Sequence, residues 1–152
     1  MTNMIEKARE QILSLVGAAY AAAAGAGELP EGVAVNANVE IPKDVANGDY
    51  TTTFALAAAK AMKKNPREIA QILLNHLDLE GSYFASAEIA GPGFLNFRLA
   101  ESWYRELLEA VEREDSAYGT NDRMEGQKVM VEFVSANPTG PMHMGNARGG
   151  VL

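Results

Sequence analysis

The residue types best suited to binding and catalysis are concentrated in residues 131–150, VEFVSANPTGPMHMGNARGG. The stretch Val129–Val134 is apolar on both faces apart from Glu132, which predicts a central parallel strand covered on both sides. A loop rich in proline and glycine follows, and the sequence HMGN, beginning at His143, then leads into a predicted helix. Open α/β sheets bind ligands where a strand ends and a helix begins, and the N–H groups at the helix start favour phosphate. The segment therefore predicts a nucleotide or phosphate site.

Individual side chains of this segment fit such a site. His143 can donate a hydrogen bond to a phosphate oxygen, and Gly145 allows a flat base to approach the backbone. The segment lacks a Gly-Lys-Ser/Thr ending, so phosphate is not held as in phosphate-loop NTPases. Glu132 needs a partner because it is a carboxylate in an apolar strand. That partner can be a ligand or a structural arginine, and His143 taken alone can equally be an ordinary loop histidine.

Residues 131–150 resemble the first signature of class I aminoacyl-tRNA synthetases, in the form found in the arginyl-tRNA synthetase family. The resemblance implies a Rossmann-like α/β catalytic domain that uses ATP, with Mg²⁺, to activate arginine and transfer it to tRNA(Arg). The implied ATP-binding residues are Pro138, Gly140, His143, Gly145 and Asn146. The implied arginine-binding residues are Glu132, Ser135 and Asn137, with Glu132 facing the guanidinium. The sequence offers no cage of protein ligands for a metal ion.

His143 and Asn146 are the implied catalytic residues, which stabilise the transition state of adenylate formation. The family pattern usually ends in histidine, and Asn146 stands at that position here. Asparagine can still donate a hydrogen bond to developing phosphate charge, but it cannot become cationic. We therefore expect an altered detail of the mechanism and not a loss of activity.

Residues 1–115 predict a domain of their own, an α+β fold with a small antiparallel sheet and helices. Alternating residues predict a strand over 33–41, and a Gly-Pro-Gly turn joins two further predicted strands, 83–90 and 94–99. Helix caps and apolar periodicity predict four helices, which begin after Asn3, Thr53 and Asn65 and at Ser102, the last with Trp103, Leu107, Ala110 and Val111 inward. Residues 116–126 are predicted to be a linker, and residues 127–152 the truncated start of the catalytic domain.

The strand over 94–99 presents two residue types that bind unpaired RNA bases. Its apolar residues at 95, 97 and 99 share one face, which leaves Phe94 and Asn96 on the other, an aromatic ring to stack and an amide to read a base edge. The segments 48–51 (GDYT) and 91–97 (GPGFLNF) resemble the N-terminal domain of arginyl-tRNA synthetases. The resemblance implies that Phe94 and Asn96 bind an unpaired D-loop nucleotide of tRNA, although Phe94 could instead pack under a neighbouring helix.

Lys63 and Lys64 are the predicted contacts to tRNA phosphates, in the densest basic patch of the sequence. Lysines at the end of a helix are also favoured by the helix dipole, so this patch has a second explanation.

The composition excludes several classes of protein. The 152 residues include no cysteine, which excludes disulfides and thiolate sites, and the net charge of −7 argues against non-specific adhesion to nucleic acid. Any contact with tRNA must therefore be local. The apolar stretch 12–26 lacks a basic leader and is too short to span a bilayer, so we expect a cytoplasmic protein with no membrane partner.

Two other functions remain open from the sequence, a small nucleotidyltransferase with a similar His-x-Gly-x site and an RNA-binding module without catalysis. One strand and a loop cannot form an active site, so we expect this chain to be inactive alone. We also expect the complete enzyme to be a monomer. The exposed strand Val129–Val134 would then pair with another copy, lie on the first domain or stay disordered.

Overall fold

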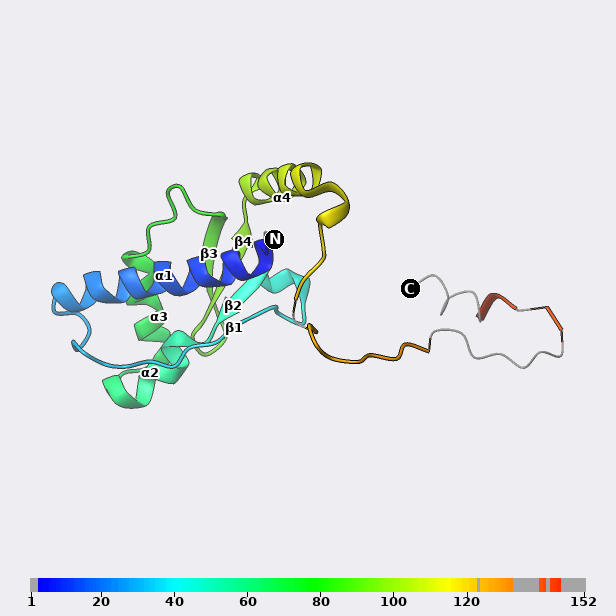
Figure 1. The fold of residues 1–152 in the computed structure, drawn as a ribbon. Coiled ribbons are helices and arrows are strands. Elements are labelled where there is room, and N and C mark those ends of the chain that lie inside the picture. The colour runs from blue at the N-terminus through cyan, green and yellow to red at the C-terminus, as the bar shows by residue number, and fades with distance from the viewer. Residues whose placement is uncertain (1–2, 123, 133–139, 142, 146–152) are drawn as a thin grey trace. The chain divides into compact units, whose positions relative to one another are not determined.

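The computed structural model describes residues 3–122, 124–132, 140–141 and 143–145, and it divides into two compact units, Met1–Gly119 and Thr120–Leu152. All the secondary-structure elements with defined bounds lie in the first unit (Figure 1). In chain order they are α1 (Met4–Gly25), β1 (Val39–Glu40), η1 (Val45–Asn47), β2 (Tyr50–Thr52), α2 (Phe54–Met62), α3 (Pro66–Asn75), β3 (Phe84–Ala90), β4 (Phe94–Leu99), α4 (Glu101–Glu114) and η2 (Asp115–Ala117). This arrangement confirms the predicted α+β class, with four helices and a small antiparallel sheet.

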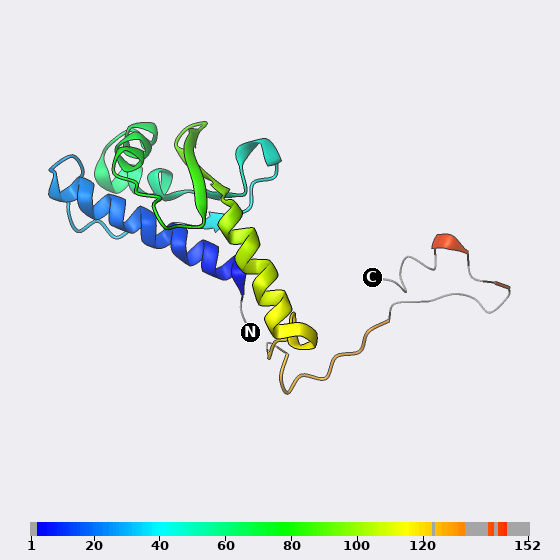
Figure 2. The same cartoon turned by 90° about the horizontal axis from the view of Figure 1, so that it is seen from above.

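The four strands form one sheet in the order β1-β2-β4-β3, and every neighbouring pair is antiparallel. Helices α1, α2 and α3 pack against this sheet and against one another (Figures 1 and 2). The largest fully buried apolar side chains come from both layers, namely Ile12, Ile69, Leu73, Leu95 and Phe97. One apolar core therefore lies between the sheet and the three helices.

Two of the helices begin at the caps that the sequence predicts. Asn3 Oδ1 accepts a hydrogen bond from the Glu6 N–H at 3.2 Å, and Asn65 Oδ1 accepts one from the Arg67 N–H at 2.9 Å. Each bond satisfies a backbone donor that the first helical turn leaves without a partner. Pro66 follows Asn65 at the first helical position, where its missing N–H costs nothing.

Three local predictions need correction. The strand predicted over 33–41 is limited to β1, although residues 33–40 do alternate between half-buried and exposed, because the apolar ones pack on the core without a strand partner. The last helix begins at Glu101 and not at Ser102. Val111 on this helix is 38% exposed, so it does not face inward as predicted.

The chain enters β2 through a close contact between Gly48 and β4. Gly48 has φ +88° and ψ −166°, a conformation that only glycine adopts readily, and a Cβ at this position would lie 2.7 Å from the carbonyl oxygen of Phe97. The neighbouring Asp49 binds β4 twice: its N–H donates to the Phe97 carbonyl oxygen at 2.8 Å, and its Oδ2 accepts from the Leu99 N–H at 2.8 Å. Gly48 and Asp49 therefore fix the register of β2 against β4.

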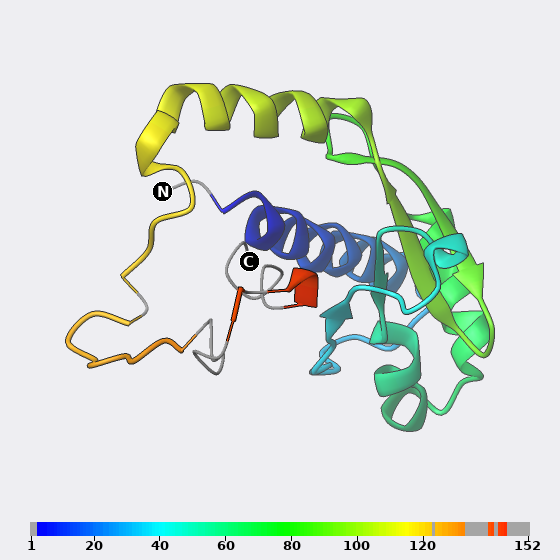
Figure 3. The same ribbon diagram turned by 90° about the vertical axis from the view of Figure 1, so that its right-hand side faces the viewer.

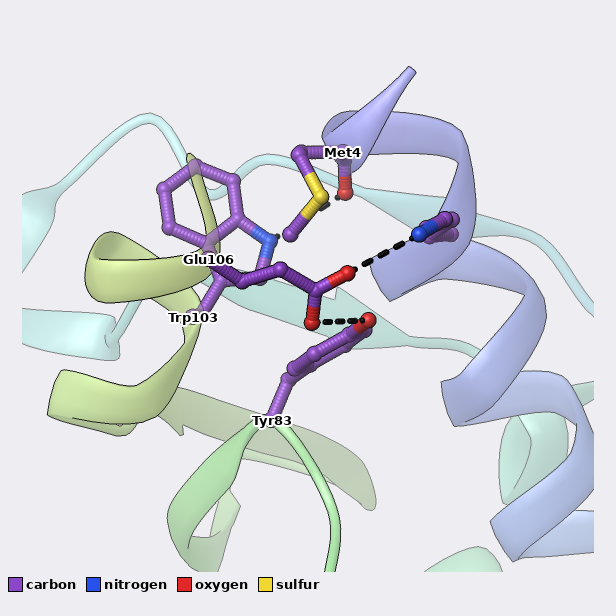
Figure 4. A network of polar contacts seen from close by, with 5 residues as sticks. Met4, Tyr83, Trp103 and Glu106 are labelled. Atoms are coloured by element: carbon purple, nitrogen blue, oxygen red, sulfur yellow. Dashed lines mark hydrogen bonds and ion pairs between the residues drawn. The ribbon is translucent and has the colours of Figure 1, made fainter. Parts of the chain in front are cut away.

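Helix α4 lies beside the first turns of α1 and is held there by a polar network (Figures 2, 3 and 4). Glu106 accepts hydrogen bonds from Lys7 Nζ at 2.9 Å and from the Tyr83 hydroxyl at 2.8 Å, and Trp103 Nε1 donates to the Met4 carbonyl at 3.2 Å. The Lys7 and Tyr83 bonds lower the pKa of Glu106 below its ordinary value of 4.5, because both stabilise the carboxylate.

Residues of the second unit have no strand in the part that the structure describes. Residues 129–132 of the predicted strand are described without one, and positions 133 and 134 lie outside the described residues. The Rossmann-like start of a catalytic domain therefore stays a prediction.

Helices of the described residues include none with the length and apolar character needed to cross a membrane.

Replacing Gly48 by alanine should destabilise the first unit by about 2–4 kcal/mol, because the new Cβ enforces both a strained conformation and a clash with β4. Urea unfolding followed by circular dichroism measures this change. Gly17→Ala is the matched control, since Gly17 is an exposed helical residue with open space around it. This control should stabilise the unit by about 0.5–1 kcal/mol. Equal stability of Gly48→Ala and wild type would contradict the role given to Gly48.

Glu106→Gln should lower Tm near neutral pH by a small amount, within the limit of about 1 kcal/mol that exposed ion pairs reach. The pKa of Glu106 is lower in the folded state, so its contribution is present above the ordinary pKa and is lost as the pH falls through the folded value. The difference in Tm between wild type and Glu106→Gln should therefore disappear in acid. Glu109→Gln, at an exposed position of the same helix, is the matched control for the loss of one negative charge from α4. A difference that persists in acid would mean that the charge of Glu106 is not responsible.

Candidate nucleic-acid interface

A hollow of about 500 Å³ opens between the segment 40–47 and the β3–β4 hairpin. This size lies within the range of small-ligand pockets, which is about 300–1,000 Å³. Its lining combines one aromatic ring, several polar groups and one basic side chain: Glu40, Ile41, Pro42, Lys43, Asn47, Thr51, Ala90, Gly91, Pro92, Phe94 and Asn96. We refer to this hollow as the hairpin pocket.

Strand register brings a row of polar residues to the hairpin pocket. Thr51 of β2 lies directly opposite Asn96 of β4, and each has a further partner on the outer strands, Glu40 on β1 and Glu88 on β3. Side chains at directly opposed positions lie on the same face of a sheet. Leu95 and Phe97 alternate with Asn96 along β4 and are fully buried in the core, so this row belongs to the other face.

Two polar atoms of this row are buried without a hydrogen-bond partner among the residues that the structure describes. They are Nδ2 of Asn96 and Oγ1 of Thr51. Asn96 is only 3% exposed, although it is an amide that most proteins would leave in water or pair with another polar group. A buried polar group without a partner costs about 1–3 kcal/mol, so such groups are uncommon outside sites where something else binds.

Phe94 stands at the edge of the pocket and is half-buried. It is not among the residues of the apolar core or those packed against that core, and it lies beside the hairpin turn, where a Cβ on Gly91 would be 3.8 Å from its Cδ2. The turn itself is fixed to the start of α3. A Cβ on Gly93 would lie 2.8 Å from the Pro66 carbonyl carbon, and Arg67 Nη1 donates to the Gly91 carbonyl at 2.8 Å. A rigid support therefore presents Phe94 to the pocket.

The basic residues near this region have different surroundings. Lys43 lines the pocket, and Arg67 is held against its Gly91 wall. Lys64 forms an exposed ion pair with Glu68, with its Nζ at 3.0 Å from Oε1. Lys63 ends α2 in a left-handed conformation with φ +50°, and its side chain is not part of the pocket lining. The structure thus brings Phe94 and Asn96 together, but it does not bring Lys63 and Lys64 into the same pocket.

In the second unit the structure describes four of the predicted site residues, Glu132, Gly140, His143 and Gly145, and all four are exposed. The Gly145 N–H donates to Nδ1 of His143 at 3.1 Å. In the neutral imidazole this bond leaves the proton on Nε2, which is then the donor. The other predicted residues, Ser135, Asn137, Pro138 and Asn146, lie outside the described residues.

A metal site was not found among the described residues, which contain no cluster of three or more histidine, aspartate or glutamate side chains suited to one ion.

Thr51 is one of the polar pocket residues that the sequence analysis did not single out. It stands within the segment GDYT, whose resemblance to a family was visible, but its position opposite Asn96 depends on the register between β2 and β4. Register across a sheet follows from contacts such as those of Gly48 and Asp49, which no local sequence pattern reveals.

Comparisons with known proteins bear on both units. The family profile described as the arginyl tRNA synthetase N terminal domain matches residues 5–99. The arginine–tRNA ligase of Acetivibrio thermocellus is 47% identical over 152 residues, which is all of this chain and 27% of that protein. That of Staphylococcus carnosus is 42% identical over 146 residues, 96% of this chain and 26% of that protein. The chain therefore spans about a quarter of the length of these curated relatives.

A similar fold occurs in a solved structure. The crystal structure of arginyl-tRNA synthetase from Plasmodium falciparum matches with a TM-score of 0.55 and 13% sequence identity, over 68% of this chain and 18% of that one. At this identity the likeness concerns the fold alone. The profile match covers more than half of the 152 residues. By this match, which includes β2, β4 and the whole lining of the hairpin pocket, the chain belongs to the arginyl-tRNA synthetase family.

Proposed function

We propose that this chain is the N-terminal part of an arginine–tRNA ligase and that its first unit binds tRNA(Arg) by taking an unpaired D-loop nucleotide into the hairpin pocket. The observation that carries this proposal is the pairing of a half-buried aromatic ring, Phe94, with a buried amide, Asn96, whose Nδ2 has no partner among the described residues. Family membership supplies the partner, because the relatives are arginine–tRNA ligases.

Recognition of an unpaired base needs a stacking surface and a hydrogen-bonding group at its edge. Phe94 supplies the surface at the pocket margin, and Asn96 supplies a donor from the strand two residues further on. The pocket volume of about 500 Å³ accommodates a single nucleotide but not a duplex. An extruded nucleotide of a loop is therefore the part of a tRNA that fits.

Phosphate contacts must be local, because the chain carries a net charge of −7. Lys43 lines the pocket and Arg67 is bonded to its Gly91 wall, and both side chains would contact phosphates next to the bound nucleotide. Lys63 and Lys64 would contact phosphates further along the tRNA. Lys64 would have to exchange Glu68 for a phosphate, which costs little because exposed ion pairs contribute at most about 1 kcal/mol.

The second unit would carry the first part of the ATP and arginine sites. His143, Gly145 and Asn146 would hold ATP together with Pro138 and Gly140, and the Nε2–H tautomer of His143 suits a phosphate oxygen. Glu132, with Ser135 and Asn137, would bind arginine, because a guanidinium offers a carboxylate both charge and planar donors. Mg²⁺ would arrive with ATP and neutralise phosphate charge. No side chain has to act as a nucleophile: the arginine carboxylate oxygen would attack the α-phosphorus of ATP, the bond to the β-phosphate would break and release pyrophosphate, and the protein would position the reactants.

Phe94→Ala should raise the Kd for a tRNA(Arg) transcript by about 5- to 150-fold, because stacking of one base on an aromatic ring contributes about 1–3 kcal/mol. Filter binding at fixed salt measures the change, and circular dichroism checks that the fold is retained. Tyr104→Ala is the matched control, since Tyr104 is an aromatic residue of α4 that is 49% exposed and is not part of the pocket lining. Unaltered binding by Phe94→Ala would rule out stacking on this ring.

The 152-residue chain should bind tRNA(Arg) without catalysing arginine-dependent ATP–pyrophosphate exchange, because it spans only about a quarter of the length of its arginine–tRNA ligase relatives. Incubation with ATP, Mg²⁺, arginine and tRNA measures both properties in one preparation. Exchange by these residues alone would overturn the proposal that they are part of a larger active site. Exchange without tRNA binding would favour a small nucleotidyltransferase instead.

A further inference from the structure

Thr51 lies next to Asn96 in the hairpin pocket, and its hydroxyl oxygen is the second buried polar atom there without a partner among the described residues. We propose that Thr51 is a further recognition residue, which hydrogen-bonds to the edge of the same base that Asn96 contacts. This inference rests on the proposed function, because it assumes that the pocket receives a nucleotide.

Geometry supports a shared ligand. Thr51 and Asn96 are directly opposed on two antiparallel strands, so their Cβ atoms are separated by about 4.5–5.5 Å and both side chains leave the sheet on one face. A base edge presents neighbouring polar atoms in one plane, so one base can meet both side chains at once. Separate ligands for the two atoms would have to crowd into the same part of the pocket.

The hydrogen-bonding properties of the Asn96 amide and the Thr51 hydroxyl determine which polar atoms the base edge must have. The Asn96 Nδ2 group only donates, so the base must place an acceptor against it. The Thr51 hydroxyl both donates and accepts, so the neighbouring atom of the base can be either an acceptor or a donor. The pocket would therefore select a planar heterocycle that has an acceptor beside a second polar atom.

The ends of the polar row restrict how the nucleotide enters. Glu40 lines the pocket beside Thr51, and Glu88 lies beyond Asn96 in the same row, with its Oε1 at 3.8 Å from Arg98 Nη2. A phosphate placed at the Thr51–Asn96 pair would face carboxylates on both sides and be repelled. The neutral base therefore goes in first, and its phosphates stay outside, on the side of Lys43.

A structural role of the Thr51 hydroxyl and a role in binding a base predict different effects on stability when this hydroxyl is removed. Thr52, the next residue, is 1% exposed and its hydroxyl donates to the Asn38 carbonyl at 3.0 Å, so its polar group is satisfied within the fold. The hydroxyl of Thr51 is buried but has no such bond within the described part of the chain. Its removal should therefore stabilise the free protein, while removal of the Thr52 hydroxyl should destabilise it.

The test compares Thr51→Val, Thr51→Ser and Thr52→Val in the complete chain, with Tm and the Kd for a tRNA(Arg) transcript as the two readouts. Thr51→Val should raise Tm by about 2–6 °C and raise Kd by about 3- to 10-fold. Thr51→Ser, which keeps the hydroxyl, should bind tRNA like wild type. Thr52→Val should lower Tm. A lower Tm for Thr51→Val would show that its hydroxyl has a structural role and would overturn the inference.

Transcripts that lack one D-loop base each locate the contact. One of these transcripts should bind the wild-type protein more weakly because it lacks the contacted base. Thr51→Val should cause no further loss of affinity for that transcript. An equal loss on that transcript would mean that Thr51 does not touch the base, which overturns the inference. If Phe94→Ala loses affinity and Thr51→Val does not, the inference fails while the proposed function stands. If neither variant loses affinity, the proposed function itself fails.

Discussion

The close approach of Gly48 to β4 is the constraint on which the pocket-lining face of this domain depends. The backbone can pass within contact distance of the Phe97 carbonyl only because Gly48 has no side chain. Asp49 then binds β4 through two hydrogen bonds and sets which residues of β2 and β4 are opposed. A shift of one residue would turn Thr51 into the core and bring Thr52 to the pocket, so the register decides the chemistry of the face.

The two faces of β4 bury side chains of different kinds. Leu95 and Phe97 stabilise the domain from the core side, while Asn96 between them carries a buried donor without a partner among the described residues. Such a group costs stability, and the fold can hold it because the core and the anchored hairpin turn determine the strand independently. Binding of a base would supply the missing hydrogen bond and recover part of that cost. The pocket would then be complementary to a ligand and strained without it.

Sequence patterns predicted the parts of the fold that local physics determines. Asn3 and Asn65 begin their helices as expected, and the strand over 94–99 has the predicted bounds and the predicted alternation. The strand predicted over residues 33–41 was wrong for most of its length. An alternating apolar pattern shows only that every second residue meets the core, whereas a strand also needs a hydrogen-bonded backbone partner. Phe94 and Asn96 could be found from their spacing, whereas Thr51 could not, because its place in the pocket follows from pairing with a strand more than forty residues away.

If the Asn96 amide gains a hydrogen-bond partner when tRNA binds, its side-chain signal in a heteronuclear correlation spectrum will report the change. The signal can be assigned by its absence in Asn96→Asp. On addition of a tRNA(Arg) transcript, we expect this signal to shift and its protons to exchange more slowly with water, while signals of exposed asparagine side chains such as Asn121 keep the positions they have without tRNA. An Asn96 signal that stays unchanged when the transcript is bound would mean that no base hydrogen-bonds to this amide.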